Sequence, residues 1–431
     1  MVNNKNNILL KNGYVIDPLK DMDSVSDVLI LDGKISKVSK DIVHENEDIE
    51  VVDVFGMIVV PGLIDCHVHL REPGYEAKET IETGSRAAAK GGFTTIMCEP
   101  NTNPPIDDIT KVENLMKKVK EKGLVNIYTK ACITKGSKGE TLTDMERLGS
   151  HSSIVAFSDD GNPVLKKDLM EEALRVAAQK HKPLSPHCED SASLSAKDIS
   201  KADLGFSPGE IFENEANYIL RDIGYARSTG CHVHFSHVSL KKSVEHIRKW
   251  KSQANITCET TPHHLLLDRD YVDNNGERPN MNPPLRSKDD VQSIKKGLSE
   301  GVIDAIASDH APHAFDDKKA GAPGVIGLET TLGLVITELV NPGIISLKDA
   351  ILKMSTNPAK IFRVSGGSLL PGTPADVTII DMNKEWIVDV SNFESKSRNS
   401  PFHGWKLKGQ AVMTIVAGRI VMKDSIVLGH R

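Results

Sequence analysis

Between residues 58 and 365 the chain alternates short apolar segments with segments that have the periodicity of helices. The apolar segments that we expect to be strands are 58–66, 93–98, 126–133, 154–158, 183–186, 232–236, 255–259 and 302–307. The helix-like segments between them include 78–90, 168–179, 210–228, 240–251 and 288–298. Eight repeated strand–helix units are typical of a (β/α)8 TIM barrel, which is the α/β fold that we predict here.

A doubly wound open sheet is the alternative fold for the same alternation. Such folds often carry a G-x-G-x-x-G sequence after a strand, and no predicted strand is followed by one. Residues 134–141 are rich in Gly, Lys and Ser, but they do not match the phosphate-binding P-loop. The barrel is therefore the preferred prediction.

The two ends of the chain have a different pattern. Residues 27–31 and 34–38 are strand-like and flank Asp32-Gly33, a strong hairpin signal. Near the other end, 375–380 is strand-like, and 413–416 is joined to 419–422 through Ala417-Gly418. We predict that residues 1–57 and 366–431 together form a small β-sandwich-like domain, with the barrel of residues 58–365 inserted between them.

Composition excludes several classes of function. The 431 residues carry a net charge of −6 without a dense basic run, which argues against a nucleic-acid-binding surface. The first ten residues do not resemble a signal peptide, and no apolar run is long enough to span a bilayer. The six cysteines lie in or beside predicted buried strands, without a C-x-x-C pair. We therefore expect reduced, buried thiols and a cytoplasmic protein with no membrane or nucleic-acid partner.

His67 and His69 follow the first apolar segment directly. In a strand, residues two apart point to the same side, so both imidazoles would project together. Such a pair is preorganised to bind zinc or a similar metal. The alternative, an exposed strand with two solvated histidines, fits poorly with the apolar residues that precede the pair.

Polar residues recur at the ends of the other predicted strands. They are Asn101, Asp159, Asp160, His187, His237, His263, His264, Asp309, His310 and His313. A barrel brings the carboxyl ends of all its strands to one face, so these residues would converge there. The sequence therefore predicts a metal site at that face.

Because side chains alternate between the two faces of a strand, some of the candidates can be assigned to the inner or the outer face of the barrel. Asp309 shares a face with the small apolar residues of its strand, and so points into the barrel. His237 also lies on the inner face, which leaves His232 and His234 on the other side as structural residues. The pair at 263–264 can either line the site or pack behind it.

Several motifs together resemble the amidohydrolase superfamily and, more narrowly, the dihydroorotases of the bacterial long-chain type. They are H-V-H-L-R-E-P-G from His67, P-N-T, S-D-D-G, H-C-E-D, S-H-V-S, M-N-P-P-L-R and S-D-H-A-P-H. The resemblance extends over the whole predicted barrel.

The resemblance implies a site for zinc, with one or two ions per subunit and a binuclear site favoured. One ion would be held by His67 and His69 and the other by His187 and His237, with Asp160 bridging and Asp309 contributing from the eighth strand. The implied substrate contacts are Arg71, Asn101, Asn282 and His313, with backbone groups of a mobile loop at Pro323 and Gly324.

The residue expected to bridge the metals at the fourth strand differs between families of the superfamily. Hydantoinases, dihydropyrimidinases and allantoinases usually have a carboxylated lysine there, whereas residues 155–161 contain no lysine and Asp160 can supply the bridging carboxylate.

Three residues depart from the family pattern. Glu99 replaces a common methionine, Pro186 interrupts the fifth strand, and Pro323 replaces a more usual aromatic residue.

The resemblance implies reversible hydrolysis of dihydroorotate to N-carbamoyl-aspartate in pyrimidine biosynthesis, with Asp309 as general base and then acid. Arg71 suits the substrate carboxylate, although a salt bridge to Glu72 is an alternative role. Asn101 and Asn282 can also be turn residues.

Two other functions remain open. One is hydrolysis of another cyclic amide, as in a hydantoinase or allantoinase. The other is a non-catalytic scaffold for aspartate transcarbamoylase, which the complete ligand set disfavours. An active enzyme could still bind that partner, and the resemblance favours a homodimer.

Overall fold

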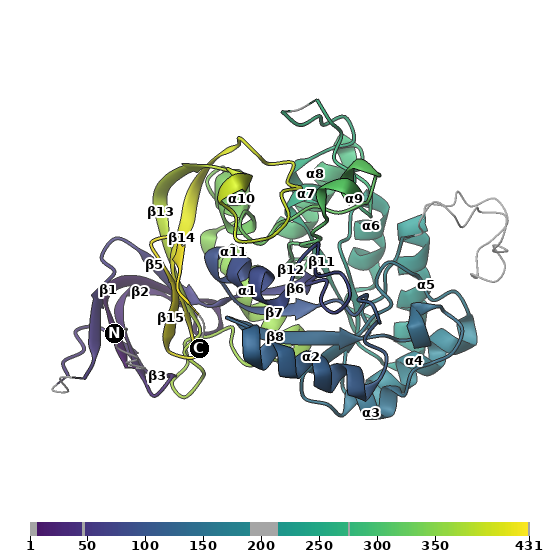
Figure 1. The fold of residues 1–431 in the computed structure, drawn as a ribbon, viewed down its shortest axis with the longest axis horizontal. Coiled ribbons are helices and arrows are strands. Elements are labelled where there is room, and N and C mark those ends of the chain that lie inside the picture. The colour runs from purple at the N-terminus through teal and green to yellow at the C-terminus, as the bar shows by residue number, and fades with distance from the viewer. Residues whose placement is uncertain (1–6, 45–47, 190–213, 275, 430–431) are drawn as a thin grey trace.

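The computed structural model describes residues 7–44, 48–189, 214–274 and 276–429. The protein is of the α/β type. One part contains parallel strands and helices, and the other is a large sheet to which both ends of the chain contribute (Figure 1).

The parallel strands form two sheets in chain order. The first contains β6 (Leu63–Val68), β7 (Phe93–Cys98), β8 (Asn126–Ala131) and β9 (Ile154–Phe157). The second contains β10 (Val233–Phe235), β11 (Ile256–Thr260) and β12 (Ala305–Ile306). Isolated parallel bridges join Phe157 to Leu184, Leu184 to Val233, and Val68 to His310. These bridges link β9 to β10 through Leu184, and β6 to the segment that follows β12.

The fifth strand predicted at 183–186, with an interruption at Pro186, is shorter than predicted, because only Leu184 forms bridges there. Pro183 and Pro186 lack the backbone N–H that a ladder needs, which explains the short pairing. Strands β10 and β12 are also shorter than predicted, β11 is displaced by one residue, and β7 has the predicted bounds.

Helices connect most of the parallel strands. They are α1 (Ile81–Lys90), α2 (Ile109–Lys122), α3 (Met145–Gly149), α4 (Lys167–Gln179), α5 (Asn214–Thr229), α6 (Lys241–Trp250), α7 (Pro262–Leu266), α8 (Lys288–Ser299), α9 (Phe315–Lys319), α10 (Thr331–Val335), α11 (Leu347–Ile351) and α12 (Asn357–Phe362). Shorter turns are η1 (Pro18–Lys20), η2 (Lys135–Ser137) and η5 (Val390–Asn392), with π-helical η3 (Ile336–Val340) and η4 (Leu352–Thr356).

The predicted helices are present with small differences at their ends. Thr80 caps α1 and Ser287 caps α8, each through a capping box with the residue three positions later. These caps satisfy backbone N–H groups of the first turn, and therefore fix where the helix begins. Of the predicted helix at 210–228, residues 210–213 lie outside the described residues.

Strands from both ends share one nine-stranded sheet. They are β1 (Ile8–Asp17), β2 (Met22–Leu31), β3 (Lys34–Ser39), β4 (Glu50–Asp53), β5 (Ile58–Pro61), β13 (Val377–Ile387), β14 (Lys406–Val416), β15 (Arg419–Lys423) and β16 (Ile426–Val427). The order is β16-β15-β14-β13-β5-β1-β2-β3, with β4 on β1. Figure 1 shows the early strands beside the late ones. Both predicted hairpins are confirmed as β2–β3 and β14–β15. The sandwich-like arrangement and the domain bounds stay predictions.

The prediction of one strand at 58–66 is wrong, because the chain changes sheets at Gly62. β5 pairs with β1 and β13 in the nine-stranded sheet, whereas β6 pairs with β7. A Cβ atom at Gly62 would lie 2.1 Å from the side-chain oxygen of Thr94. Its N–H donates to the carbonyl of Asp376 at 2.9 Å. Glycine therefore permits the close passage of the chain from one sheet to the other.

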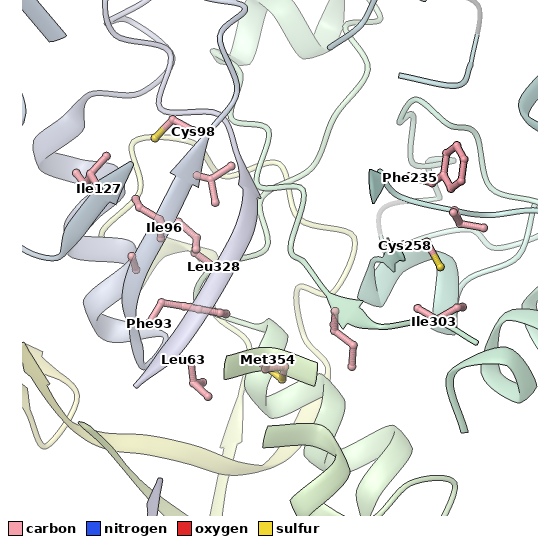
Figure 2. Close-up of a cluster of buried hydrophobic side chains, with 14 of the residues drawn as sticks. Leu63, Phe93, Ile96, Cys98, Ile127, Phe235, Cys258, Ile303, Leu328 and Met354 are labelled. Atoms are coloured by element: carbon pink, nitrogen blue, oxygen red, sulfur yellow. The ribbon is translucent and has the colours of Figure 1, made fainter. Parts of the chain in front are cut away.

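A continuous apolar core surrounds the parallel strands (Figure 2). Leu63, Phe93 and Ile96 lie on one side, and Phe235 and Ile303 lie across the core from them. All six cysteines are buried and free, as predicted. Within the described part of the chain, no helix combines the length and apolar character needed to cross a membrane.

Candidate metal centre

Two histidines at the end of β6 face a carboxylate that follows β12. His67 and His69 are buried, and their Nε2 atoms lie 3.7 Å and 3.3 Å from Oδ1 of Asp309. Asp309 has a φ of 47°, a left-handed conformation that is uncommon for a residue other than glycine. Together the three residues form a group whose ligand atoms are close enough to share one metal ion.

Asp160, which follows β9, contacts the four histidines that the resemblance implies as metal ligands. Its Oδ1 atom lies 3.5 Å from His67 Nε2, 3.4 Å from His187 Nδ1 and 3.7 Å from His237 Nε2. Its Oδ2 atom lies 3.7 Å from His69 Nε2. His187 Nδ1 and His237 Nε2 are 3.2 Å apart. A second group that could hold an ion contains His67, Asp160 and His237.

The electrostatics of this cluster suit a cation. Burial acts to raise the pKa of Asp160, but its polar contacts with the side chains of His187, His237 and His67 together lower that pKa well below its ordinary value. Burial likewise acts to raise the pKa of Asp309, but the hydrogen bond with His69 and the charges of His67, His69 and His237 together lower it below its ordinary value. The Nε2 atom of His67 is buried, and it has no hydrogen-bond partner among the residues that the structure describes. Ionised carboxylates beside an unpartnered imidazole nitrogen form a donor set that fits zinc or a similar divalent metal.

Glu99 lies behind the cluster, where a buried lysine balances its negative charge. It forms a fully buried ion pair with Lys130 of β8. The Nζ atom of Lys130 also donates to Ser185 at 3.1 Å. Pairing offsets part of the cost of burying the two charges.

Glu259 of β11 also contacts this cluster and was not identified from the sequence. Its Oε1 atom lies 2.8 Å from His67 Nδ1. Its Oε2 atom lies 3.0 Å from His234 Nε2. His234 and His232 both contact Thr257 at 2.8 Å. Alternation placed both histidines away from the site, but the contact with Glu259 brings His234 next to the partner of His67. The available signal for Glu259 was an acidic residue at the end of an otherwise buried strand.

Asn101 and Asn282 contact the predicted ligands. The side chain of Asn101 lies 3.0 Å from His69 Nδ1 through its oxygen, and donates to Asp160 Oδ2 at 3.0 Å. The amide nitrogen of Asn282 lies 3.2 Å from His187 Nε2. The structure therefore brings both residues to the cluster.

Arg71 and His313 lie together beside Asp309. Arg71 donates from Nε to the carbonyl of Pro312 at 3.1 Å, and its terminal nitrogen lies 3.3 Å from His313 Nε2. Burial, followed by the charge of Arg71, lowers the pKa of His313 to about 3, so the imidazole is neutral near pH 7. Glu72 pairs with Lys118 at 3.0 Å, and no ion pair joins it to Arg71 within the described residues.

The segment at Pro323 and Gly324 also lies beside His313. The carbonyl of Pro323 lies 2.8 Å from His313 Nε2. Gly324 has a φ of 133°, and a Cβ atom there would lie 2.8 Å from the Cβ of Ala311. Only glycine fits this conformation and this approach.

His263 and His264 are both buried in α7, and their surroundings differ. His264 contacts Thr261 Oγ1 at 2.9 Å and the carbonyl of Pro283 at 3.0 Å, which is a packing role. The Nε2 atom of His263 has no hydrogen-bond partner among the described residues. Burial lowers its pKa to about 4.

The sequence was compared with known families and proteins. Residues 56–243 match the family model described as Dihydro-orotase-like. Proteins named dihydroorotase from Syntrophus aciditrophicus and Aquifex aeolicus are 43% and 45% identical over 427 and 425 residues, which is 97% of this chain and 99% of each relative. The chain belongs to the dihydroorotase family. This confirms the resemblance that the motifs indicate, and places the Asp160 cluster in a dihydroorotase-family chain.

Solved structures of other amidohydrolases share the fold. An L-hydantoinase (dihydropyrimidinase) from Arthrobacter aurescens has a TM-score of 0.88 at 26% identity, covering 98% of this chain and 97% of that one. A dihydropyrimidinase from Brevibacillus agri has a TM-score of 0.85 at 22% identity, covering 98% and 96%.

Proposed function

We propose that this chain is a dihydroorotase, which hydrolyses the cyclic amide of dihydroorotate to N-carbamoyl-aspartate and catalyses the reverse closure in pyrimidine biosynthesis. The observation that carries the proposal is Asp160, whose carboxylate contacts His67, His69, His187 and His237 at the position where hydantoinases usually have a lysine. Identity of 43% to a protein named dihydroorotase over nearly the whole chain supports the same reaction.

The proposed fold is a closed (β/α)8 barrel. The parallel sheets β6–β9 and β10–β12 support it, as do the bridges through Leu184 and between Val68 and His310. Closure around one ring would bring all the strand ends to one face, where the metal and substrate residues belong.

The proposed cofactor is zinc, with two ions favoured. His67 and His69 would hold one ion, His187 and His237 the other, with Asp160 between them and Asp309 beside the first. Imidazole and carboxylate ligands suit zinc, and the buried unpartnered Nε2 of His67 supports a ligand role.

In the proposed mechanism, zinc held by these histidines and Asp160 would lower the pKa of a water molecule and would act as a Lewis acid towards the amide carbonyl. Asp309 accepts the proton of the attacking water and returns it to the ring nitrogen as the amide bond breaks. Arg71 binds the substrate carboxylate through its planar fork. Asn101, Asn282, His313 and the backbone of Pro323 and Gly324 form the remaining wall of the substrate site.

We further propose a cytoplasmic homo-oligomer, with a dimer favoured by the resemblance. Gel filtration with light scattering tests the dimer. Mixing with aspartate transcarbamoylase in the same experiment tests association with that enzyme.

The decisive experiment measures turnover of dihydroorotate, hydantoin and allantoin by protein of known metal content. We expect turnover of dihydroorotate, and a loss of about 100-fold or more in Asp309→Asn because general acid–base catalysis is removed. Asp289→Asn changes an exposed carboxylate on α8 and should leave turnover unchanged. Preference for hydantoin would overturn the substrate proposal, and absence of both metal and turnover would favour the scaffold.

A further inference from the structure

A chain of buried polar groups runs from the candidate metal centre into the core behind β6. The Nδ1 atom of His67 lies 2.8 Å from Oε1 of Glu259. The other oxygen, Oε2, accepts from Cys66 Sγ at 2.8 Å and lies 3.0 Å from His234 Nε2. His67, Glu259, Cys66 and His234 are all at most 1% exposed, so water does not compete for these bonds.

The direction of the hydrogen bonds along this chain follows from the groups present. Glu259 as a carboxylate only accepts, so His67 Nδ1 carries its proton and donates it. The lone pair of His67 is then on Nε2, the atom that faces Asp160 and Asp309. The donors at Oε2 favour the carboxylate form of Glu259 and hold its plane.

The alternative partner for His67 Nδ1 is Glu99. Its Oε1 atom is 3.6 Å away, beyond good hydrogen-bond distance, and Glu99 is paired with Lys130. The Cys66–His234–Glu259 cluster could instead bind a metal of its own. Burial raises the pKa of the Cys66 thiol, however, and the neutral thiol is a poor ligand.

We propose that Glu259 is a positioning residue that fixes the tautomer and ring orientation of His67 for metal binding, and that His234 and Cys66 hold Glu259 in place. The inference rests on the proposed metal site and adds a residue to it. A carboxylate that binds the second nitrogen of a metal-ligating histidine strengthens metal affinity, and its loss typically weakens that affinity 10- to 100-fold.

Glu259→Gln is the discriminating variant. The donors of Cys66 and His234 would draw the amide oxygen of Gln towards themselves. Its NH2 group would then face His67 Nδ1 and favour the tautomer with the proton on Nε2, which cannot bind the metal. The size of the side chain is unchanged, so packing is kept.

The experiment measures the Kd for Zn2+ of metal-free protein by competition with a chromogenic chelator, without substrate. We expect Kd to rise about 10- to 100-fold in Glu259→Gln. Cys66→Ser keeps a donor to Glu259 and should stay within about threefold of the parent. Glu329→Gln is the matched control, because the Glu329 side chain is buried, accepts from the backbone N–H groups of Glu394 and Ser395, and contacts no predicted metal ligand among the described residues.

Urea unfolding of the same metal-free proteins separates positioning from loss of structure. An equal Kd in Glu259→Gln and the parent would overturn the inference and leave the proposed function intact. An equal weakening in Glu329→Gln would also overturn it, because a general loss of stability would then explain the effect. A parent protein that binds no Zn2+ would instead overturn the metal site and this inference with it.

Discussion

Arg71 is held in the candidate site by its backbone and by a carbonyl group. It has a φ of 61°, and its Nε donates to Pro312 O. No carboxylate lies within ion-pair distance of its guanidinium in the described ranges, since Glu72 is bound to Lys118. Among the described residues, the fork of Arg71 therefore has no acidic partner, which is what a carboxylate-binding role requires.

We expect Arg71→Lys to lower kcat/KM for dihydroorotate by about 10- to 100-fold, mainly through KM. A hydrogen bond to a charged group contributes about 1.5–3 kcal/mol, and lysine keeps the charge but loses the two-pronged geometry. Steady-state kinetics measures this, with Arg175→Lys as the control because Arg175 is exposed on α4. Unchanged KM in Arg71→Lys would show that Arg71 does not bind the substrate carboxylate.

The sequence predicts the residues at the strand ends better than those behind them. His67, His69, Asp160 and Asp309 follow apolar segments, and alternation with barrel geometry is enough to bring them together. Glu259 could not be assigned in this way, because its partners come from β6 and β10. Those contacts depend on how three strands are aligned in space, and a single sequence does not give that alignment.

Helix α9 and the segment after it are joined through one lysine. Lys318 Nζ donates to the carbonyls of Ala322 at 2.7 Å, Gly324 at 2.9 Å and Asn280 at 3.2 Å. These bonds tie the proposed substrate loop to the segment that leads to Asn282. Burial lowers the pKa of Lys318 to about 8, against a smaller opposing effect of Glu277.

We expect Lys318→Met to raise KM for dihydroorotate several-fold, because the loop loses these hydrogen bonds. The ammonium form supplies all three donors, and the parent loses one of them as pH rises through about 8. The ratio of KM between variant and parent should therefore be largest below pH 8 and decrease above it. KM measured from pH 6.5 to 9.5 tests this, with exposed Lys319→Met as the neighbouring control. A ratio that does not change with pH would contradict the role of the ammonium group.

Whole elements were predictable where local signals fix them. Helix α8 begins at the predicted residue 288, after its cap Ser287, whereas α1 begins after its cap Thr80 and therefore later than the predicted start at 78. The division at Gly62 and the single bridge at Leu184 were missed. Strand length depends on which neighbour offers hydrogen bonds, and that is a property of the assembled sheet.

At the scale of the whole molecule, the nine-stranded sheet is bonded to the parallel part by threonines. Thr378 Oγ1 of β13 donates to the carbonyl of Gly92 at 2.6 Å and accepts from the N–H of Leu63 at 3.3 Å. Thr414 Oγ1 of β14 donates to the carbonyl of Ala89 at 2.8 Å. Because these bonds are buried and β5 continues into β6, the sheet and the parallel strands should unfold together.

Thr378→Val tests this coupling. Valine has nearly the same shape but leaves Gly92 O and Leu63 N without the hydroxyl, at a cost of about 1–3 kcal/mol in the free energy of unfolding. Trp250 of α6 reports on the parallel part, whereas Trp386 and Trp405 report on β13 and the start of β14. Variants that keep only one set of tryptophans give two fluorescence probes for urea unfolding. We expect Thr378→Val to lower both midpoints equally, while exposed Thr141→Val lowers neither. A shift seen by Trp386 and Trp405 alone would mean that the sheet formed by the two chain ends unfolds as a separate unit.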